Sequence, residues 1–305
     1  MDRFEAMTML LTVVEKGSLS AAGRSLGVPV PTLSRKISDL EAVLSTRLLV
    51  RTTRKLTLTD AGLTYVGAAR RILEQVEEAE REAAGEFTAP KGELIVTAPM
   101  AFGRLYVLPV VTDFLALFPE ISVRLLLTDR SLQLVDEHVD LAIRVGKLPD
   151  SAMIATRVGS MRMVVCASPA LLAGHGVPNT PDDLQRLPCL AFNWLASSAT
   201  WQFRGSGAGA AVEISVAPRL SVSTAEAAVE AAIRNVGVTR LFHYQAAEAV
   251  EAGALQIVLE DFELEPAPIH LIHAARGQMP LKMRRFLDFA TPKLRQALSR
   301  FAAAP

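Results

Sequence analysis

The first 44 residues carry three short apolar stripes at helical spacing, and glycines separate them. Because glycine favours the left-handed backbone that ends a helix, Gly17 and Gly27 divide this segment into three helices. We expect Ser18 or Ser20 to cap the second helix, over residues 21–26. The third should start at residues 29–32 and carry the stripe Leu33, Ile37, Leu40 and Leu44. Two helices joined by a tight glycine-containing turn are typical of a helix-turn-helix.

A two-stranded hairpin is predicted directly after these helices. Residues 47–51 and 56–59 read as strands, and the second strand alternates apolar and polar residues. The turn between them, at 52–55, is polar and contains Arg54 and Lys55. A basic turn of this kind is suited to touching a phosphate backbone, so we interpret the hairpin as a wing.

Basic charge gathers in this part of the chain. The whole sequence has 32 Lys and Arg against 32 Asp and Glu, but residues 24–56 hold seven basic and two acidic residues. A basic patch confined to one small segment fits contact with phosphates. Charge alone leaves a solvated basic face open as the alternative.

A long helix is predicted from Thr59 or Asp60, either of which can cap it, to about Phe87. A heptad-like seam runs along it through Ala61, Tyr65, Ala68, Ile72, Gln75 and Ala79. Such a helix needs a partner to bury its seam, so we expect pairing with a second copy of the chain. Packing on the C-terminal region is the alternative. Residues 90–92, Pro-Lys-Gly, then break the helix and mark a hinge.

Beyond residue 92, short apolar runs typical of strands alternate with helical stretches. The strands are expected at 94–97, 123–127, 141–145 and 162–167. The helices are expected at 105–118, 132–138, 170–172, 224–235 and 282–301. This alternation predicts an α/β region with a largely parallel sheet.

The two cysteines favour a reducing compartment. Cys166 and Cys189 lie far apart in the sequence and fit buried, reduced thiols, with a redox-switch pair as the alternative. The apolar stretch 7–14 lacks a cleavage site and is too short to cross a bilayer. We therefore expect a cytoplasmic protein with no membrane partner.

An enzyme is one alternative class, and the sequence gives it little support. No HExxH, GxSxG or P-loop motif occurs. His270 and His273 should point to opposite faces of one strand, which argues against a shared metal. Residues 205–209 have GxGxG spacing and precede an expected strand at 211–216, which favours a hairpin turn over a dinucleotide loop. We expect no catalytic residue, no cofactor and no metal.

Four ordered N-terminal segments resemble the LysR-type transcriptional regulators: SAAGRSL at 20–26, PTLSRKISDLE at 31–41, TRLLVRTTR at 46–54 and LTDAG at 58–62. Weaker matches follow at 99–104, 139–146 and 149–151, so that the resemblance covers essentially the whole chain. A solute-binding protein is the second alternative class, but the N-terminal pattern and the lack of a signal sequence argue against it.

The resemblance implies a domain organisation. Residues 1–60 would form a winged helix-turn-helix rich in α-helix, and 61–89 a linker helix that dimerises. A two-lobed α/β effector domain, similar to periplasmic solute-binding proteins, would follow. Lobe I would take 90–163 and 267–305 and lobe II 164–266, with crossovers near Arg162 and at 267–269.

The resemblance also implies a function and a set of partners. The chain would regulate transcription by binding double-stranded DNA in a sequence-specific way, under the control of a small-molecule effector. Its other partners would be its own copies, in a homodimer or homotetramer, and RNA polymerase. The family usually has a glycine-rich run ending in an apolar-Pro pair where this chain has residues 235–243, which leaves the pocket wall near Phe242 and His243 uncertain.

The expected DNA contacts fall in two groups. The start of the recognition helix, which should enter the major groove, places Val30, Pro31, Thr32, Ser34 and Arg35 near base edges. Arg35 is the expected bidentate partner of a guanine. Phosphates would be held by Ser34, Lys36, Arg51, Thr53 and Arg54. For each basic residue, a solvated surface charge is the alternative.

The expected effector contacts come from both lobes. A strand runs into a helix start at Thr97, Pro99, Met100, Phe102 and Gly103, where backbone N–H groups suit an anion. Arg144 could orient the same group, with an ion pair to Asp140 or Asp129 as the alternative. Ser223, Thr224 and Phe242 would face them from lobe II. We therefore expect a small anionic metabolite.

Overall fold

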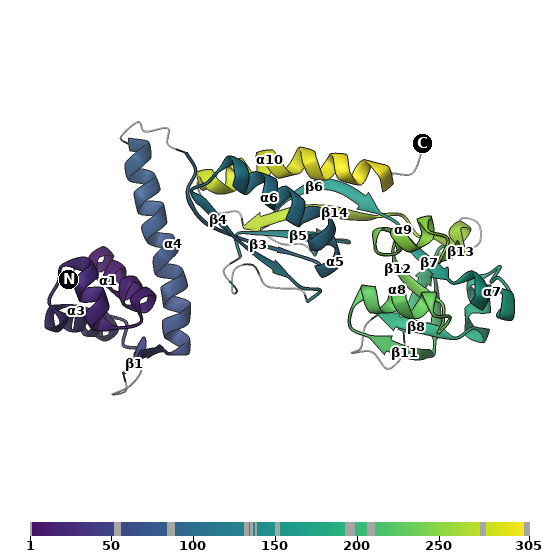
Figure 1. The fold of residues 1–305 in the computed structure, drawn as a ribbon, viewed down its shortest axis with the longest axis horizontal. Coiled ribbons are helices and arrows are strands. Elements are labelled where there is room, and N and C mark those ends of the chain that lie inside the picture. The colour runs from purple at the N-terminus through teal and green to yellow at the C-terminus, as the bar shows by residue number, and fades with distance from the viewer. Residues whose placement is uncertain are drawn as a thin grey trace. The chain divides into compact units, whose positions relative to one another are not determined.

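The computed structural model describes residues 2–51, 56–83, 89–130, 134, 137, 139–149, 153–192, 199–205, 211–274 and 279–301. The chain divides into two compact units, Met1–Gly92 and Glu93–Pro305. The division falls directly after Gly92, between the elements labelled α4 and β4 in Figure 1.

Three short helices open the N-terminal unit: α1 (Arg3–Lys16), α2 (Leu19–Leu26) and α3 (Val30–Val43). Gly17 and Gly27 end the first two with φ of 67° and 66°, as predicted. Ser18 is the cap of α2, because its hydroxyl accepts the Ala21 N–H at 3.1 Å. Ser20 lies inside the helix instead.

The core of this unit confirms the predicted apolar stripe of the third helix. Leu33, Ile37 and Leu40 are buried against side chains of α1 and α2, and Leu44 is partly buried beside them. Each fully buried Leu or Ile contributes about 1.5–3 kcal/mol. This packing holds one face of α3 inward and leaves its other face to solvent.

The predicted wing is present. Strand β1 (Leu49–Arg51) pairs antiparallel with β2 (Leu56–Leu58), and the turn at 52–55 lies outside the described residues. The following helix α4 (Asp60–Ala83) is capped by Thr59, whose Oγ1 accepts the Gly62 N–H at 2.9 Å. A Cβ at Gly62 would stand 2.1 Å from the Leu48 carbonyl oxygen, so glycine lets the wing lie directly on the first turn of α4.

Two faces of α4 differ in burial. Val66 and Ala69 are buried on the N-terminal unit. The predicted heptad seam is half-buried at Tyr65 and Ala68, and Ile72 on the same seam is 37 % exposed. The expected helix end at Phe87 lies outside the described residues.

The C-terminal unit begins with lobe I, built on a five-stranded sheet of order β4-β3-β5-β14-β6. These strands are β3 (Gly92–Ala98), β4 (Ile121–Leu127), β5 (Leu141–Val145), β6 (Met153–Met161) and β14 (Ala267–Ala274). Strands β3 and β5 are parallel, whereas β14 runs antiparallel to both β5 and β6.

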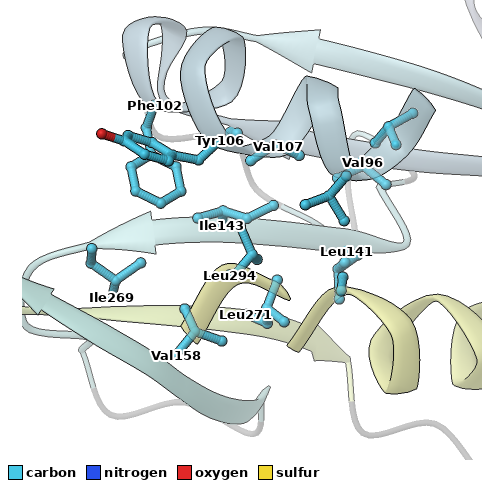
Figure 2. Close-up of a cluster of buried hydrophobic side chains, with 14 of the residues drawn as sticks. Val96, Phe102, Tyr106, Val107, Leu141, Ile143, Val158, Ile269, Leu271 and Leu294 are labelled. Carbon is cyan, nitrogen blue, oxygen red and sulfur yellow. The ribbon is translucent and has the colours of Figure 1, made fainter. Parts of the chain in front are cut away.

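One face of this sheet is covered by helices. A continuous helical run comprises α5 (Met100–Phe102), the π-helical turn η1 (Gly103–Val107) and α6 (Leu108–Leu117). The C-terminal helix α10 (Leu281–Leu298) and the short 3-10 helix η4 (Ser299–Phe301) pack beside it. Figure 2 shows Phe102 and Tyr106 close together at one end of this core and Val96 and Leu141 toward the other.

The run Met100–Leu117 is long and apolar enough to cross a membrane by length and composition alone. Its Phe102, Val107 and Phe114 are nevertheless buried in the lobe I core. The run is therefore a core helix of this lobe.

Lobe II contains smaller sheets. Strand β7 (Met163–Ala167) pairs antiparallel with β12 (Thr239–Phe242) and β13 (Gln256–Val258). Strand β8 (Cys189–Phe192) is parallel to β11 (Pro218–Val222), and β9 (Ala199–Phe203) forms a hairpin with β10 (Val212–Val216). The helices are α7 (Pro169–His175), α8 (Ala225–Ile233) and α9 (His243–Glu251), with 3-10 turns η2 (Pro181–Arg186) and η3 (Glu260–Phe262).

The prediction of a largely parallel sheet is confirmed only in part: β3, β5 and β6 run in one direction, but the pairings through β14 and β7 are antiparallel. Strand β14 returns from lobe II and enters the lobe I sheet in the reverse direction, and both partners of β7 also run antiparallel to it. The hairpin predicted around residues 205–209 is confirmed by the pairing of Phe203 with Val212, although 206–210 lie outside the described residues. Most of the helix expected at 132–138 does too, and Leu134 and Glu137 within it lie in turns.

Two short segments connect the sheet of lobe I with lobe II. Arg162 follows β6 directly, and Ala267 at the start of β14 lies opposite Met161. The Arg162 guanidinium donates to Glu263 and to Glu260 at 2.7 Å. Hydrogen bonds to these two carboxylates raise the pKa of Arg162. Arg162, which follows β6, is thus bound by two carboxylates that lie a few residues before the start of β14.

Candidate functional sites

The predicted base-reading residues lie on the outward side of α3. Val30 is 38 % exposed, Pro31 and Arg35 are exposed, and Thr32 and Ser34 are half-buried. Helix α3 starts after Pro29 without a side-chain cap. The inward stripe fixes the helix, so these five residues occupy a rigid first turn and a half that a ligand can approach.

The residues predicted to contact phosphates differ from one another in exposure and in ion pairing. Lys36 is half-buried and its Nζ lies 2.5 Å from Glu5 Oε2 of α1. Arg51 ends strand β1. Thr53 and Arg54 lie outside the described residues. Arg35 differs from Lys36 in that, within the described residues, no ion pair engages its guanidinium.

In lobe I, the expected effector segment is partly closed by its own contacts. Thr97 is fully buried, and its hydroxyl donates to the Leu126 carbonyl oxygen at 2.9 Å. Phe102 and Gly103 are buried as well. In this conformation the backbone after Pro99 and the 38 % exposed Met100 are the accessible parts of the segment.

A carboxylate already stands at the start of this helical run. The Met100 N–H donates to Asp129 Oδ1 at 3.0 Å. Asp129 was missed in the sequence analysis as a partner of this backbone, because no spacing rule links it to a helix start 29 residues earlier. A side-chain anion here is favoured by the partial positive charge of a helix N-terminus.

The start of α8 in lobe II lies near the same helical run. Thr224 caps α8, since its Oγ1 accepts the Ala227 N–H at 3.2 Å, and Ser223 precedes it at the surface. Arg104 Nη2 is 3.9 Å from Glu226 Oε1 in the first turn of α8. The structure therefore brings together the two segments that the sequence predicted to share a ligand.

Aromatic rings join the lobes beside these helix starts. Tyr244 of α9 contacts Phe102 and Tyr106 of lobe I, with ring centroids 5.5 and 6.0 Å apart. Phe242 stacks on Tyr244 at 6.1 Å. Burial, and then the charge of Asp129, raises the pKa of Tyr244, so its hydroxyl stays protonated at neutral pH.

Arg144 is half-buried on β5, opposite His270 of β14. Burial lowers its pKa and the charge of Glu137 raises it. Of the two acids expected as alternative partners, Asp140 accepts the Ile95 N–H and Asp129 accepts the Met100 N–H. Glu137, a residue that sequence reasoning missed, is the acid whose charge acts on Arg144.

The stretch 235–243, which departs from the family pattern, keeps a regular structure. Asn235 has a φ of 62° and its Oδ1 accepts the Ser168 hydroxyl at 2.5 Å. Strand β12 follows, with Phe242 opposite Met163. The His243 ring packs edge-on against Phe301, with centroids 5.4 Å apart.

Comparison with known proteins gives two family matches and many relatives. Residues 4–63 match the bacterial regulatory helix-turn-helix protein of the lysR family, and residues 88–295 match the LysR substrate binding domain. A probable HTH-type transcriptional regulator, LtrA of Klebsiella pneumoniae, is 32 % identical and covers 93 % of this chain and 92 % of its own length.

Two solved structures are similar over the full length. CrgA of Neisseria meningitidis, a LysR-type transcriptional regulator, is 30 % identical with a TM-score of 0.60, covering 95 % of this chain and 98 % of that one. The Vibrio cholerae virulence activator AphB is 28 % identical with a TM-score of 0.59, covering 94 % and 98 %.

Proposed function

This chain belongs to the LysR family of DNA-binding transcriptional regulators, and we propose that the start of α3 reads its operator in the major groove. The observation that carries the proposal is the exposure of Val30, Pro31 and Arg35 on a helix whose opposite face is buried. Arg35 would bind a guanine through two hydrogen bonds, and Val30 and Pro31 would contact thymine methyl groups. Thr32 and Ser34 would lie at the edge of the same groove.

Phosphates would be gripped on either side of this helix. Ser34, Lys36, Arg51, Thr53 and Arg54 are the proposed contacts, and they would orient the protein without reading sequence. A phosphate reaching Lys36 would compete with Glu5 for the ammonium group. Lys36 should therefore contribute less to binding than an unpaired lysine.

The first experiment is a fluorescence-anisotropy titration of the purified protein with its own upstream intergenic DNA and with scrambled DNA, over a series of salt concentrations. We expect tight binding that prefers the native sequence and weakens steeply with salt, because phosphate contacts release counterions. Absence of binding at low salt would contradict a DNA-binding role.

For the effector, we propose a small organic anion bound between the start of the 100–117 helical run and the start of α8. Pro99, Met100, Gly103 and the caps Ser223 and Thr224 would supply backbone and hydroxyl donors there. Thr97 and Phe102, which are buried, would hold residues 99–103 in place from the side of the lobe I core. Phe242 and Arg144 would border the ligand. The nearness of Arg104 to Glu226 supports a site shared by these helix starts.

Asp129 sets a condition on this proposal, since its carboxylate holds the Met100 N–H. An anionic effector would exchange with that carboxylate. Thermal-shift screening of carboxylic acids against matched neutral amides and alcohols tests the class of effector. Asp129→Asn should strengthen carboxylate binding several-fold, whereas Asp113→Asn, which changes an exposed acid paired with Lys293, should not. Stabilisation by neutral compounds alone would refute an anionic effector.

The remaining parts of the proposal concern the compartment, the oligomeric state and the partners of the protein. We infer that the protein acts in the cytoplasm as a homodimer or homotetramer, with RNA polymerase as a further partner and without catalytic activity. Its relatives are transcriptional regulators, which supports this setting. The domain limits 1–60, 61–89, 90–163 with 267–305, and 164–266 remain our proposed division.

A further inference from the structure

Lobe I carries a cavity of about 640 Å³ that is open to solvent and is lined by Met279 and by residues of α10, β6 and β14. Small-molecule sites typically have volumes of roughly 300–1,000 Å³. The residues that line it are Ile154, Thr156, His273, Met279, Arg284, Leu287, Asp288, Thr291 and Pro292. None of them belongs to the proposed effector site. We propose that this cavity is a second ligand site that binds a free α-amino acid with an apolar side chain.

The charge pattern points to an amphoteric ligand. Arg284 and Asp288 are four residues apart on α10, so that their side chains leave the same face of the helix about 5–6 Å from each other. Both are exposed, and within the described residues neither makes an ion pair or a side-chain hydrogen bond. The carboxylate and ammonium groups of one amino acid would bind this pair together.

The residues that line the cavity also offer hydrogen-bond acceptors for an ammonium group. His273 is 3 % exposed, and its Nδ1 donates to the Ala274 carbonyl oxygen at 3.1 Å. In the tautomer with the proton on Nδ1, Nε2 is an acceptor. Pro292 has no N–H, so the Asp288 carbonyl lacks its usual helical donor. In the proposed complex, these two acceptors and the Asp288 carboxylate would bind the ammonium group.

The rest of the lining fits the other parts of such a ligand. The Thr156 and Thr291 hydroxyls can join Arg284 in donating to the carboxylate. Ile154, which is 46 % exposed, forms an apolar wall with Met279 and Leu287. A ligand with only one of the two charges would leave Arg284 or Asp288 without its partner, so selectivity for the zwitterion follows.

The test is isothermal titration of the full-length protein with the twenty amino acids. Two analogues of leucine complete the panel: 4-methylpentanoate, which lacks the ammonium group, and isoamylamine, which lacks the carboxylate. We expect an apolar amino acid to bind at least about tenfold more tightly than either analogue, because each analogue lacks one of the two charged groups that would bind Arg284 and Asp288.

Substitutions at the cavity test whether the amino acid binds there. Arg284→Gln and Asp288→Asn should each weaken the binding about tenfold, a loss typical of one charged hydrogen bond. The matched control is Arg285→Gln, which changes the neighbouring exposed arginine outside the cavity and should leave the affinity unchanged. All three positions are at the surface, and unchanged thermal unfolding of each variant would verify its fold.

Three results would overturn the proposal. One is the absence of binding by any amino acid at millimolar concentration. Another is equal binding by 4-methylpentanoate. The third is binding that survives both cavity variants but is lost in Thr224→Ala, which would assign the amino acid to the proposed effector site. Since carboxylate binding at that site is measured separately with Asp129→Asn, failure of either proposal is distinguishable from failure of the other.

Discussion

At the scale of single residues, two neighbouring cations that look equivalent in the sequence differ in their contacts in the structure. Arg35 and Lys36 are adjacent in a basic segment. Lys36 is paired with Glu5, whereas Arg35 is exposed on the outward face of α3. Arg35 thus has the freedom to meet a base edge at little cost in broken contacts.

Arg35→Ala is expected to weaken binding to the operator by about 1–3 kcal/mol and to relax the preference at one base pair. The reason is the loss of a bidentate contact to guanine. A binding selection on randomised DNA would measure it, with Arg124→Ala as the control, because Arg124 pairs with Glu93 in lobe I. An unchanged preference at every base pair would contradict the assignment.

The thiols give a second prediction at this scale. Burial raises the pKa of Cys166 to about 12 and of Cys189 to about 11. The thiolate is the reactive form, so both side chains should stay protonated and inert at pH 7–8. We expect a thiol-reactive disulfide reagent to label the folded protein slowly and the unfolded protein at both cysteines. Rapid labelling in the folded state would favour the redox alternative.

At the scale of elements, one close contact fixes the wing. Gly62, in the first turn of α4, lies so near the Leu48 carbonyl that any Cβ would collide with it. The collision involves backbone, which cannot rotate away as a side chain can. The position of the wing relative to α4 therefore depends on the absence of one side chain.

Gly62→Ala should displace β1 from α4, lower stability by at least about 1 kcal/mol and weaken DNA binding. The control is Gly174→Ala in α7, where a Cβ would meet nothing within 4 Å. That change should be neutral or should stabilise by about 0.4–1 kcal/mol. Urea unfolding and the anisotropy assay would measure both variants. Equal effects of the two changes would argue against the close contact.

Local patterns predicted the N-terminal helices well, but they missed α9 and several strands, among them β6 and β12, and they did not predict how the strands pair. Glycine and serine positions predicted the ends of α1 and α2, because caps act within a few residues. The direction of β14 was missed, because a strand that returns from the second lobe carries no local mark of its orientation. Asp129 and Glu137 were missed for the same reason, since both act on residues that only the fold brings near.

At the scale of the whole molecule, the heptad-like seam of α4 is the feature that most strongly predicts pairing with a second copy of the chain. Ile72 is 37 % exposed, one turn beyond the part of α4 where Val66 and Ala69 are buried. Pairing through this seam remains a prediction.

Ile72→Glu should shift the protein toward monomer, because a charge would enter the expected interface. The control is Leu63→Glu, which places the same charge at a 60 % exposed leucine of α4 that is not on the seam. Sedimentation velocity over a range of concentrations would measure the change. An oligomer that survives Ile72→Glu would favour packing of α4 elsewhere.

The order of strands in lobe I has a consequence for synthesis on the ribosome. Among the described residues, strand β6 has one neighbour in its sheet, β14, which begins at Ala267. All of residues 162–266 must be translated before that neighbour exists. Lobe II can close in this interval, since its core clusters draw on residues within 163–262. Lobe I, begun first, is therefore completed last, and the nascent chain carries an unpaired strand that is open to aggregation until its C-terminal segment emerges.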